Sequence, residues 1–133
     1  MSHLLDVNLL VACGSRSHAD HRETRRWLEV QRQFFTCPLT HLGFLRVSIS
    51  PAFRATFEDA RNALQELTRL EGARFVADGL PGTVLPALQS ANEVTDAYLV
   101  ALARARRLRL ATLDDALCDK PWARGIAVNP LKS

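Results

Sequence analysis

Three aspartates and one asparagine occupy positions where polar side chains could act together on a ligand. Asp6 follows a short apolar run at the start of the chain, and Asn8 lies two residues further on. Asp96 lies in the first turn of a strongly amphipathic segment, and Asp114 follows another short apolar run. Carboxylate and amide oxygens are the ligands that hard divalent cations prefer. Asp6 also has a simpler interpretation as a helix cap, and Asp96 as a helix-start acid, so their chemistry depends on whether the fold brings the acids together.

The elements that would position these residues are visible in the hydrophobic pattern. Short apolar runs alternate with helical patterns along the chain, which predicts a parallel sheet covered by helices on both faces. The predicted strands are His3–Leu5, Gln33–Cys37, Ala73–Ala77, Leu108–Thr112 and Gly125–Asn129. With no repeat, linker or low-complexity tract, residues 1–133 are interpreted as a single α/β domain.

Helices are predicted between these strands from apolar residues spaced three and four apart. The predicted segments are Val7–Ala12, Ser17–Gln31, Leu39–Ser48, Thr56–Leu70, Pro81–Gln89 and a helix that opens at Asn92 and carries its apolar stripe to Leu108. The buried stripes are predicted to consist of Ala19, Trp27, Leu28 and Val30; of Leu39, Leu42, Leu45 and Val47; of Phe57, Ala60, Leu64, Leu67 and Leu70; and of Val94, Ala97, Tyr98, Ala101, Leu102, Ala105 and Leu108.

Composition limits the classes of protein to consider. The chain has 133 residues, of which 47% are hydrophobic, and a formal net charge of +3. No apolar run approaches the roughly 18 residues of a membrane span, so no membrane association is expected. The three cysteines, Cys13, Cys37 and Cys118, have no metal or redox spacing, and a reducing cytoplasm is the expected location. The basic balance favours a nucleic-acid partner.

The aspartates are expected to meet because the carboxyl ends of parallel strands share one edge of the sheet. Asp6 and Asp114 follow strands, and Asp96 begins a helix packed against the same edge. Three converging acids repel one another, and a divalent cation such as Mg²⁺ or Mn²⁺ relieves that repulsion. Such a metal can activate a water and neutralise charge on a phosphodiester during its displacement. Asn8 could orient a ligand or its water.

Other site chemistries lack their sequence signals. No GxGxxG, GxxxxGK[ST] or GxSxG motif is present. A covalent aspartyl-phosphate mechanism would require a second acid at position 8, and this chain has Asn8 there. His18 and His21 have a spacing that can chelate a metal on a helix, but no third ligand has matching spacing. The preferred interpretation of both histidines is a solvated helix start.

The ordered set of motifs resembles the PIN-domain ribonucleases, and most closely the VapC toxins of toxin–antitoxin pairs. The matching segments are Leu5–Leu10, His18 to Leu28, Cys37–Val47, Val94–Leu99 with Ala101–Ala103, and Ala111–Asp114. Each segment alone is weakly specific, but together they cover essentially the whole chain in order.

This resemblance implies a three-layer α/β/α domain with a five-stranded parallel sheet. It also implies Mg²⁺- or Mn²⁺-dependent endonucleolytic cleavage of structured RNA, commonly transfer or ribosomal RNA, by a homodimer that a small antitoxin restrains. The family acids carry over to Asp6, Asp96 and Asp114, with Asn8 and Thr112 as supporting polar residues. Asp115 is expected to support metal-bound water. RNA contacts are expected from arginines, among them Arg22, Arg25, Arg26, Arg46, Arg104, Arg106 and Arg107.

One position departs from the family pattern. The family often has Glu soon after the second strand, where this chain has His41. Imidazole binds Mg²⁺ poorly and suits Mn²⁺ better, although Asp115, Glu93 or a carboxylate from a partner chain could supply the missing charge. The leading hypothesis is a metal-dependent endoribonuclease toxin with His41 near its site. The alternatives are a PIN-like module that binds RNA or protein without cutting, and a DNA nuclease of the same fold.

Overall fold

Five parallel strands form the centre of the molecule. The computed structural model describes residues 1–132, and the last residue of the predicted domain, Ser133, lies outside them. The strands are β1 (His3–Leu5), β2 (Phe34–Thr36), β3 (Ala73–Phe75), β4 (Arg109–Ala111) and β5 (Ala127–Val128). Their order across the sheet is β3-β2-β1-β4-β5. The predicted five-stranded parallel sheet is therefore confirmed; β1 has the predicted bounds, and the other four strands are shorter than predicted.

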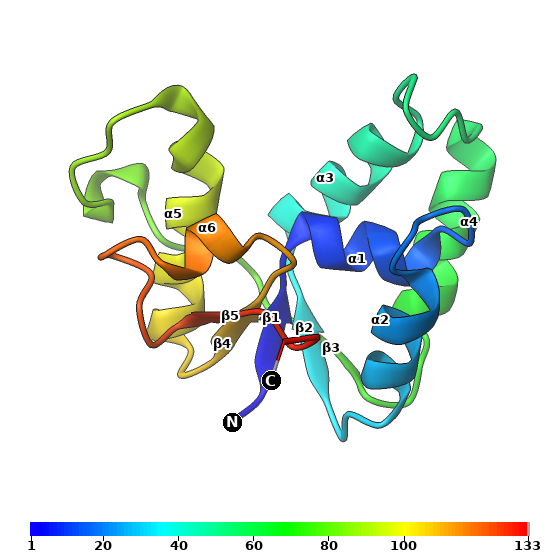
Figure 1. The fold of residues 1–133 in the computed structure, drawn as a ribbon, viewed down its shortest axis with the longest axis horizontal. Helices are drawn as coiled ribbons and strands as arrows, with labels where there is room; N and C mark the ends of the chain where they lie inside the picture. The colour runs from blue at the N-terminus through cyan, green and yellow to red at the C-terminus, as the bar shows by residue number, and fades with distance from the viewer. Residues whose placement is uncertain (133) are drawn as a thin grey trace.

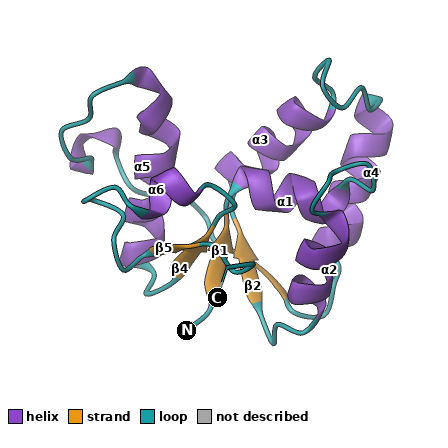
Figure 2. Ribbon diagram, in the orientation of Figure 1, coloured by secondary structure: helices purple, strands orange, loops and turns teal. Residues whose placement is uncertain are grey.

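Helices cover both faces of the sheet. They are α1 (Val7–Gly14), α2 (His21–Glu29), α3 (Pro38–Ser48), α4 (Phe57–Thr68), α5 (Val94–Ala105) and α6 (Asp115–Cys118), with 3₁₀ turns η1 (Gly82–Val84) and η2 (Ala91–Glu93). Figures 1 and 2 show α5 and α6 on one side of the strands and α1 to α4 on the other. The predicted three-layer α/β/α arrangement is confirmed.

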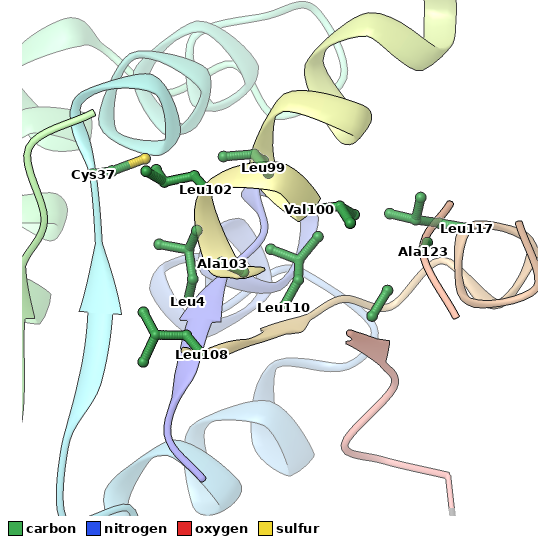
Figure 3. Close-up of a cluster of buried hydrophobic side chains, with 11 residues drawn as sticks. Leu4, Cys37, Leu99, Val100, Leu102, Ala103, Leu108, Leu110, Leu117 and Ala123 are labelled. Carbon is green, nitrogen blue, oxygen red and sulfur yellow. The ribbon is translucent and has the colours of Figure 1, made fainter. Parts of the chain in front are cut away.

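Two hydrophobic cores lie on opposite faces of the sheet, because successive residues of a strand point to opposite faces. Leu4 and Leu110 pack against Leu99 and Leu102 of α5, as Figure 3 shows. The residues that follow them in the strands, Leu5 and Ala111, belong to the core on the other face. Its buried members are Leu5, Leu9, Leu10, Val11, Cys13, Leu28, Phe34, Phe44, Leu64, Leu67 and Ala111. Burial on both faces fixes β1 and β4 at the centre, and so fixes the residues that follow them.

Helix α3 is held close to α1 at a glycine. Pro38 opens α3, where its missing N–H has no intrahelical role. The Thr40 hydroxyl accepts a 3.0 Å hydrogen bond from the Cys37 N–H. A Cβ on Gly43 would lie 2.5 Å from a methyl carbon of Val7. Only glycine therefore permits this approach, which sets the position of α3 beside the start of α1.

This approach explains why the buried face of α3 differs from the predicted one. The buried residues are Thr40, Gly43, Phe44 and Ser48. Leu42, which was predicted to point inward, is 58% exposed. Other residues of the predicted stripes are also exposed: Ala19, Val30, Phe57, Val94 and Ala105. Hydrophobic spacing predicted these helices, but the packing of neighbouring elements decided which face each helix buries.

The prediction of a helix over Pro81–Gln89 is wrong. Only the 3₁₀ turn η1 forms there, and Leu85 is extended with ψ 148°. Proline disfavours helical backbone at the residue before it, and Pro86 follows Leu85 directly. The helix predicted from Ser17 to Gln31 is likewise shorter, because α2 begins only at His21 and ends at Glu29.

Candidate active site

Asp6 lies at the carboxyl end of β1, where it caps α1. Its side chain is 3% exposed. Oδ1 accepts a 2.7 Å hydrogen bond from the Val7 N–H, and Oδ2 accepts a 2.7 Å hydrogen bond from the Thr112 hydroxyl. The capping role that the sequence suggested is therefore real. It also holds the carboxylate in one orientation at the edge of the sheet.

Thr112 connects the polar residues at this edge. Its fully buried hydroxyl donates to Asp6 and accepts hydrogen bonds from the Asn8 amide and the Asp114 N–H, each at 3.1 Å. Asn8 Oδ1 accepts from the Leu113 N–H at 3.1 Å. The ends of β1 and β4 are adjacent in the sheet, so these bonds join the segments that follow the two strands. Asn8 and Thr112 thus position the acids through a connected network.

Asp96 and Asp114 reach the same edge from two helices. Asp96 lies in the first turn of α5 and is half-buried. Asp114 caps the short helix α6, where its Oδ1 accepts from the Leu117 N–H at 3.2 Å. Asp114 is exposed, in contrast to Asp6. The fold therefore supplies one buried, one half-buried and one exposed carboxylate.

Two cavities meet at Asp96. One, of about 300 Å³, is lined by Asp6, Asn8 and Asp96 together with apolar and aromatic side chains. The other, of about 440 Å³, is lined by Asp96 and Asp114 together with polar residues of the segment before α5 and with Ala116 and Leu117 of α6. Asp96 therefore lies between two spaces of different character, each bounded by one of the other two aspartates.

The three carboxylates influence one another electrostatically. Burial raises the pKa of Asp96 to about 6, and the charges of Asp6, Asp114 and Glu93 add to the increase. Burial also raises the pKa of Asp6, against the opposing effect of its hydrogen bonds from Thr112 and Val7. Within residues 1–132, neither Lys nor Arg forms an ion pair with any of the three aspartates. Lys120 lines the larger cavity but pairs with Glu93, so none of the three aspartates has a paired cation among the described residues.

This donor set fits a hydrated divalent cation rather than a closed protein cage. In the part of the chain that the structure describes, no group of three or more His, Cys, Asp or Glu side chains is close enough to form a metal centre by itself. Mg²⁺ usually keeps several waters and binds only one or two carboxylates directly. Asp96, paired with either Asp6 or Asp114, could provide that number of ligands.

His41 and Asp115, two of the expected supporting residues, have other partners. The His41 Nε2 lies 2.8 Å from the Thr36 hydroxyl, and its ring centroid lies 5.2 Å from that of Phe75. Burial lowers the pKa of His41. Asp115 accepts a 2.9 Å hydrogen bond from Asn129 and pairs with Lys132 at 3.6 Å. Neither His41 nor Asp115 lines the two cavities.

The expected RNA-binding arginines are distributed over the molecule. Three of them lie at the end of α5, next to the start of β4: Arg104, Arg106 and Arg107. They therefore lie near the amino ends of the strands, whereas Asp96 lies near the carboxyl ends. Arg25 pairs with Glu29 at 3.2 Å. The exposed side chains of Arg22, Arg26 and Arg46 lie on α2 and α3. Arg46 directly precedes Val47, which lines the smaller cavity.

Sequence reasoning missed several residues at the site. His18, interpreted as solvated, lines the smaller cavity with Phe53. Lys120 and Trp122 line the larger cavity, and the Lys120 Nζ pairs with Glu93 at 3.2 Å. Hydrogen bonds from the Gln89 N–H and from Lys120 lower the pKa of Glu93. These residues come from loops and 3₁₀ turns, whose positions leave no periodic signal in the sequence.

A three-layer fold with acids at the carboxyl ends of a parallel sheet defines the class as an α/β domain with an acidic site. The family model described as "PIN domain" matches residues 3–123. Among curated proteins, Ribonuclease VapC38 of Mycobacterium tuberculosis strain H37Rv is 42% identical over 118 residues, which cover 84% of each chain. Ribonuclease VapC44 of the same organism is 35% identical over 127 residues, 88% of this chain and 89% of its own. The chain therefore belongs to the PIN-domain family, among the VapC-type ribonuclease toxins.

Solved structures share the fold at lower sequence identity. VapC20 of Mycobacterium tuberculosis, described as a sarcin-ricin loop cleaving toxin, has a TM-score of 0.64 at 15% identity and covers 88% of this chain and 92% of its own. VapBC2 from Rickettsia felis, bound to a DNA fragment from its promoter, has a TM-score of 0.65 at 15% identity, with coverage of 97% and 98%. At this identity the likeness shows the fold alone.

In residues 1–132, no helix has both the length and the apolar character needed to span a membrane.

Proposed function

We propose that this ribonuclease toxin is a Mg²⁺- or Mn²⁺-dependent endonuclease that cleaves structured RNA and thereby arrests translation and growth. One observation supports the metal dependence: Asp6, Asp96 and Asp114 influence one another at one edge of the sheet, and within residues 1–132 none of them forms an ion pair with Lys or Arg. A bound divalent cation would lower the pKa of water and neutralise charge on the phosphodiester.

The chain's own residues have separable tasks in this proposal. Asp96 lies between the two cavities and would hold the metal together with Asp6 or Asp114. Thr112 and Asn8 keep the Asp6 carboxylate oriented before substrate arrives. Asp6 is 3% exposed, so its own carboxylate is largely shielded from bulk water. Such preorganisation reduces the rearrangement needed when charge develops at the phosphate.

Transfer RNA and ribosomal RNA are the substrate classes that we propose. The relatives named as VapC ribonucleases support action on RNA. A neighbour in fold is described as cleaving the sarcin-ricin loop, which supports a folded RNA target. Exposed arginines on α2 and α3 provide positive charge for phosphate contacts.

A small antitoxin is the proposed protein partner, and we propose that the toxin itself forms a homodimer. The solved VapBC2 complex, whose fold matches over 97% of this chain, supports a partner of the VapB type. Co-expression of the chain with and without the short reading frame beside its gene tests this assignment. Growth arrest that the neighbouring product relieves is expected, and arrest that it does not relieve would contradict the pairing.

Cleavage of transfer and ribosomal RNA with Mg²⁺, with Mn²⁺ and with EDTA tests the proposed activity. The wild type should cleave with either metal and stop in EDTA, while Asp96→Asn and Asp6→Asn should lose at least about a hundredfold of the rate, a loss typical of removing a group that stabilises transition-state charge. Asp59→Asn, an exposed acid on α4, is the matched control. Equal cleavage by the wild type, Asp96→Asn and Asp6→Asn would contradict the assignment of Asp96 and Asp6 to the active site.

A module that binds RNA or protein without cutting is the second candidate, favoured by His41 in place of the family glutamate. It would give salt-sensitive RNA binding without calorimetric metal binding. Substrates with deoxy substitutions separate the third candidate, a DNA nuclease, because only RNA carries the 2′-hydroxyl.

A further inference from the structure

One wall of the smaller cavity is aromatic. His18 lies in the segment before α2, and Phe53 lies in the turn that follows α3. Their ring centroids are 6.0 Å apart and their planes differ by only 7°. Both rings line the cavity that also contains Asp6 and Asp96. Two segments distant in sequence thus present near-parallel rings beside two of the site's carboxylates.

The ring of His18 is held in one orientation. The Asp20 N–H donates a 3.0 Å hydrogen bond to His18 Nδ1, so Nδ1 acts as an acceptor. In the neutral ring the proton therefore resides on Nε2. Nε2–H remains as a donor for a ligand.

Phe53 is also held in place by its turn. Its N–H donates to the Ser50 carbonyl at 3.1 Å, and the Arg54 N–H donates to the same carbonyl at 2.7 Å. Arg54 has a φ of 56°, in the left-handed region that arginine rarely adopts. A backbone conformation of this kind persists where the surrounding structure requires it. Here it reverses the chain directly after the ring that stacks on His18.

The remaining walls of the cavity define the ligand that fits. Val7, Val11 and Val47 are the apolar residues of its lining, whereas Asp6, Asn8 and Asp96 are polar. A suitable ligand therefore has a planar, largely uncharged part joined at short distance to a group that an acidic metal site attracts. A nucleotide combines both parts, because its base has a π-face and its phosphate is attached through one ribose.

We propose that His18 and Phe53 form a nucleobase subsite for the nucleotide next to the phosphodiester that is cut. The inference rests on the proposed function for the position of that phosphodiester. Stacking on the ring pair tolerates any base, since each base has a π-face. The Nε2 donor of His18 would add a hydrogen bond to an acceptor at the edge of the base.

Titration of the isotope-labelled protein, followed by NMR, tests the subsite without any cleavage. The probes are adenosine, guanosine, cytidine and uridine 5′-monophosphates in Mg²⁺, and ribose 5-phosphate is the control that lacks a base. Nucleotides should shift the side-chain signals of His18 and Phe53, and ribose 5-phosphate should leave those signals in place. Phe53→Leu and His18→Ala should each weaken nucleotide binding by roughly tenfold, the loss typical of removing a stacking ring.

A matched variant controls for the loss of an aromatic ring. Phe57, on α4, is 52% exposed and does not line the cavity, so Phe57→Leu should bind nucleotides like the wild type. Because Phe53 packs partly against a core, the dispersion of the α5 signals shows whether Phe53→Leu is folded. His18→Ala gives an independent measurement if Phe53→Leu unfolds.

Two results would overturn the subsite. In one, ribose 5-phosphate shifts both rings as strongly as the nucleotides do. In the other, the nucleotides shift neither ring while N-acetyl-tryptophanamide, a probe for a protein side chain, shifts both. The cavity would then receive a partner protein. Absence of RNA cleavage together with base-dependent shifts would contradict the proposed function and leave the subsite standing.

Discussion

The Thr112 hydroxyl donates to Asp6 Oδ2 at 2.7 Å, across two neighbouring strands and 106 residues of sequence. The same oxygen accepts hydrogen bonds from the Asn8 amide and the Asp114 N–H. One buried side chain therefore links three of the polar positions that the sequence indicates as a site. The orientation of Asp6 depends on the sheet itself and not on a bound ligand.

Thr112→Val should damage both stability and activity. Valine has nearly the same shape but cannot donate to Asp6 or accept from Asn8. The free energy of unfolding should fall by about 1–3 kcal/mol, the cost of leaving buried polar groups unpaired. RNA cleavage should fall at least tenfold, because the Asp6 carboxylate is no longer fixed. Urea unfolding and cleavage rates measure the two effects.

Thr112→Ser is the matched control for that substitution, since serine keeps the hydroxyl and loses only a methyl group. It should retain most of the cleavage rate. If Thr112→Val cleaved RNA as fast as Thr112→Ser, the hydrogen-bond network would have no part in positioning the acid.

The raised pKa of Asp96, about 6, should make stability depend on pH. The usual pKa is 3.8, so between about pH 4 and pH 6 the folded protein retains a proton that the unfolded chain releases. The free energy of unfolding therefore falls as pH rises through this window. The fall should be on the order of 1 kcal/mol, because solvent screens a half-exposed carboxyl.

Asp96→Asn isolates this contribution. The variant should gain stability relative to the wild type as pH rises from 4 to 7, and urea unfolding at each pH measures the difference. Asp59→Asn, at an exposed position, should show no such gain. An Asp96→Asn difference that stays constant across the range would contradict the raised pKa of Asp96.

Divalent cations should stabilise the folded chain if the aspartates bind them. At a concentration one hundred times the Kd, binding adds about 2.7 kcal/mol to the free energy of unfolding. For a chain of this size, that should raise Tm by several degrees. Thermal unfolding in Mg²⁺, Mn²⁺ and EDTA measures the shift. Asp96→Asn should lose the shift and Asp59→Asn should keep it; a shift that survives Asp96→Asn would locate the metal elsewhere.

The sequence predicted the parts of the fold that follow from local patterns. Apolar runs identified all five strands, and strand ends identified Asp6 and Asp114 as neighbours at one edge. Buried faces were harder to predict, because Gly43 lets α3 approach Val7 and so leaves Leu42 exposed.

The aromatic wall of the smaller cavity shows the limit of prediction within the site. His18 and Phe53 meet only because a loop and a turn, separated by α2, β2 and α3, fold over the same edge. Neither residue lies at a strand end, and neither belongs to a helical stripe. Tertiary packing alone brings them beside Asp6.

Exposed arginines near the site should contribute to RNA binding more than those at the far edge of the sheet. Arg46 is exposed on α3, beside Val47 of the smaller cavity, whereas Arg107 follows α5 at the opposite edge. Arg46→Ala should weaken RNA binding and reduce the slope of log K against log salt by about one, as the loss of one phosphate contact does. Arg107→Ala removes the same charge and should leave that slope unchanged. Fluorescence anisotropy with labelled RNA at several salt concentrations measures both, and equal losses in the two variants would show that net charge, rather than location, governs binding.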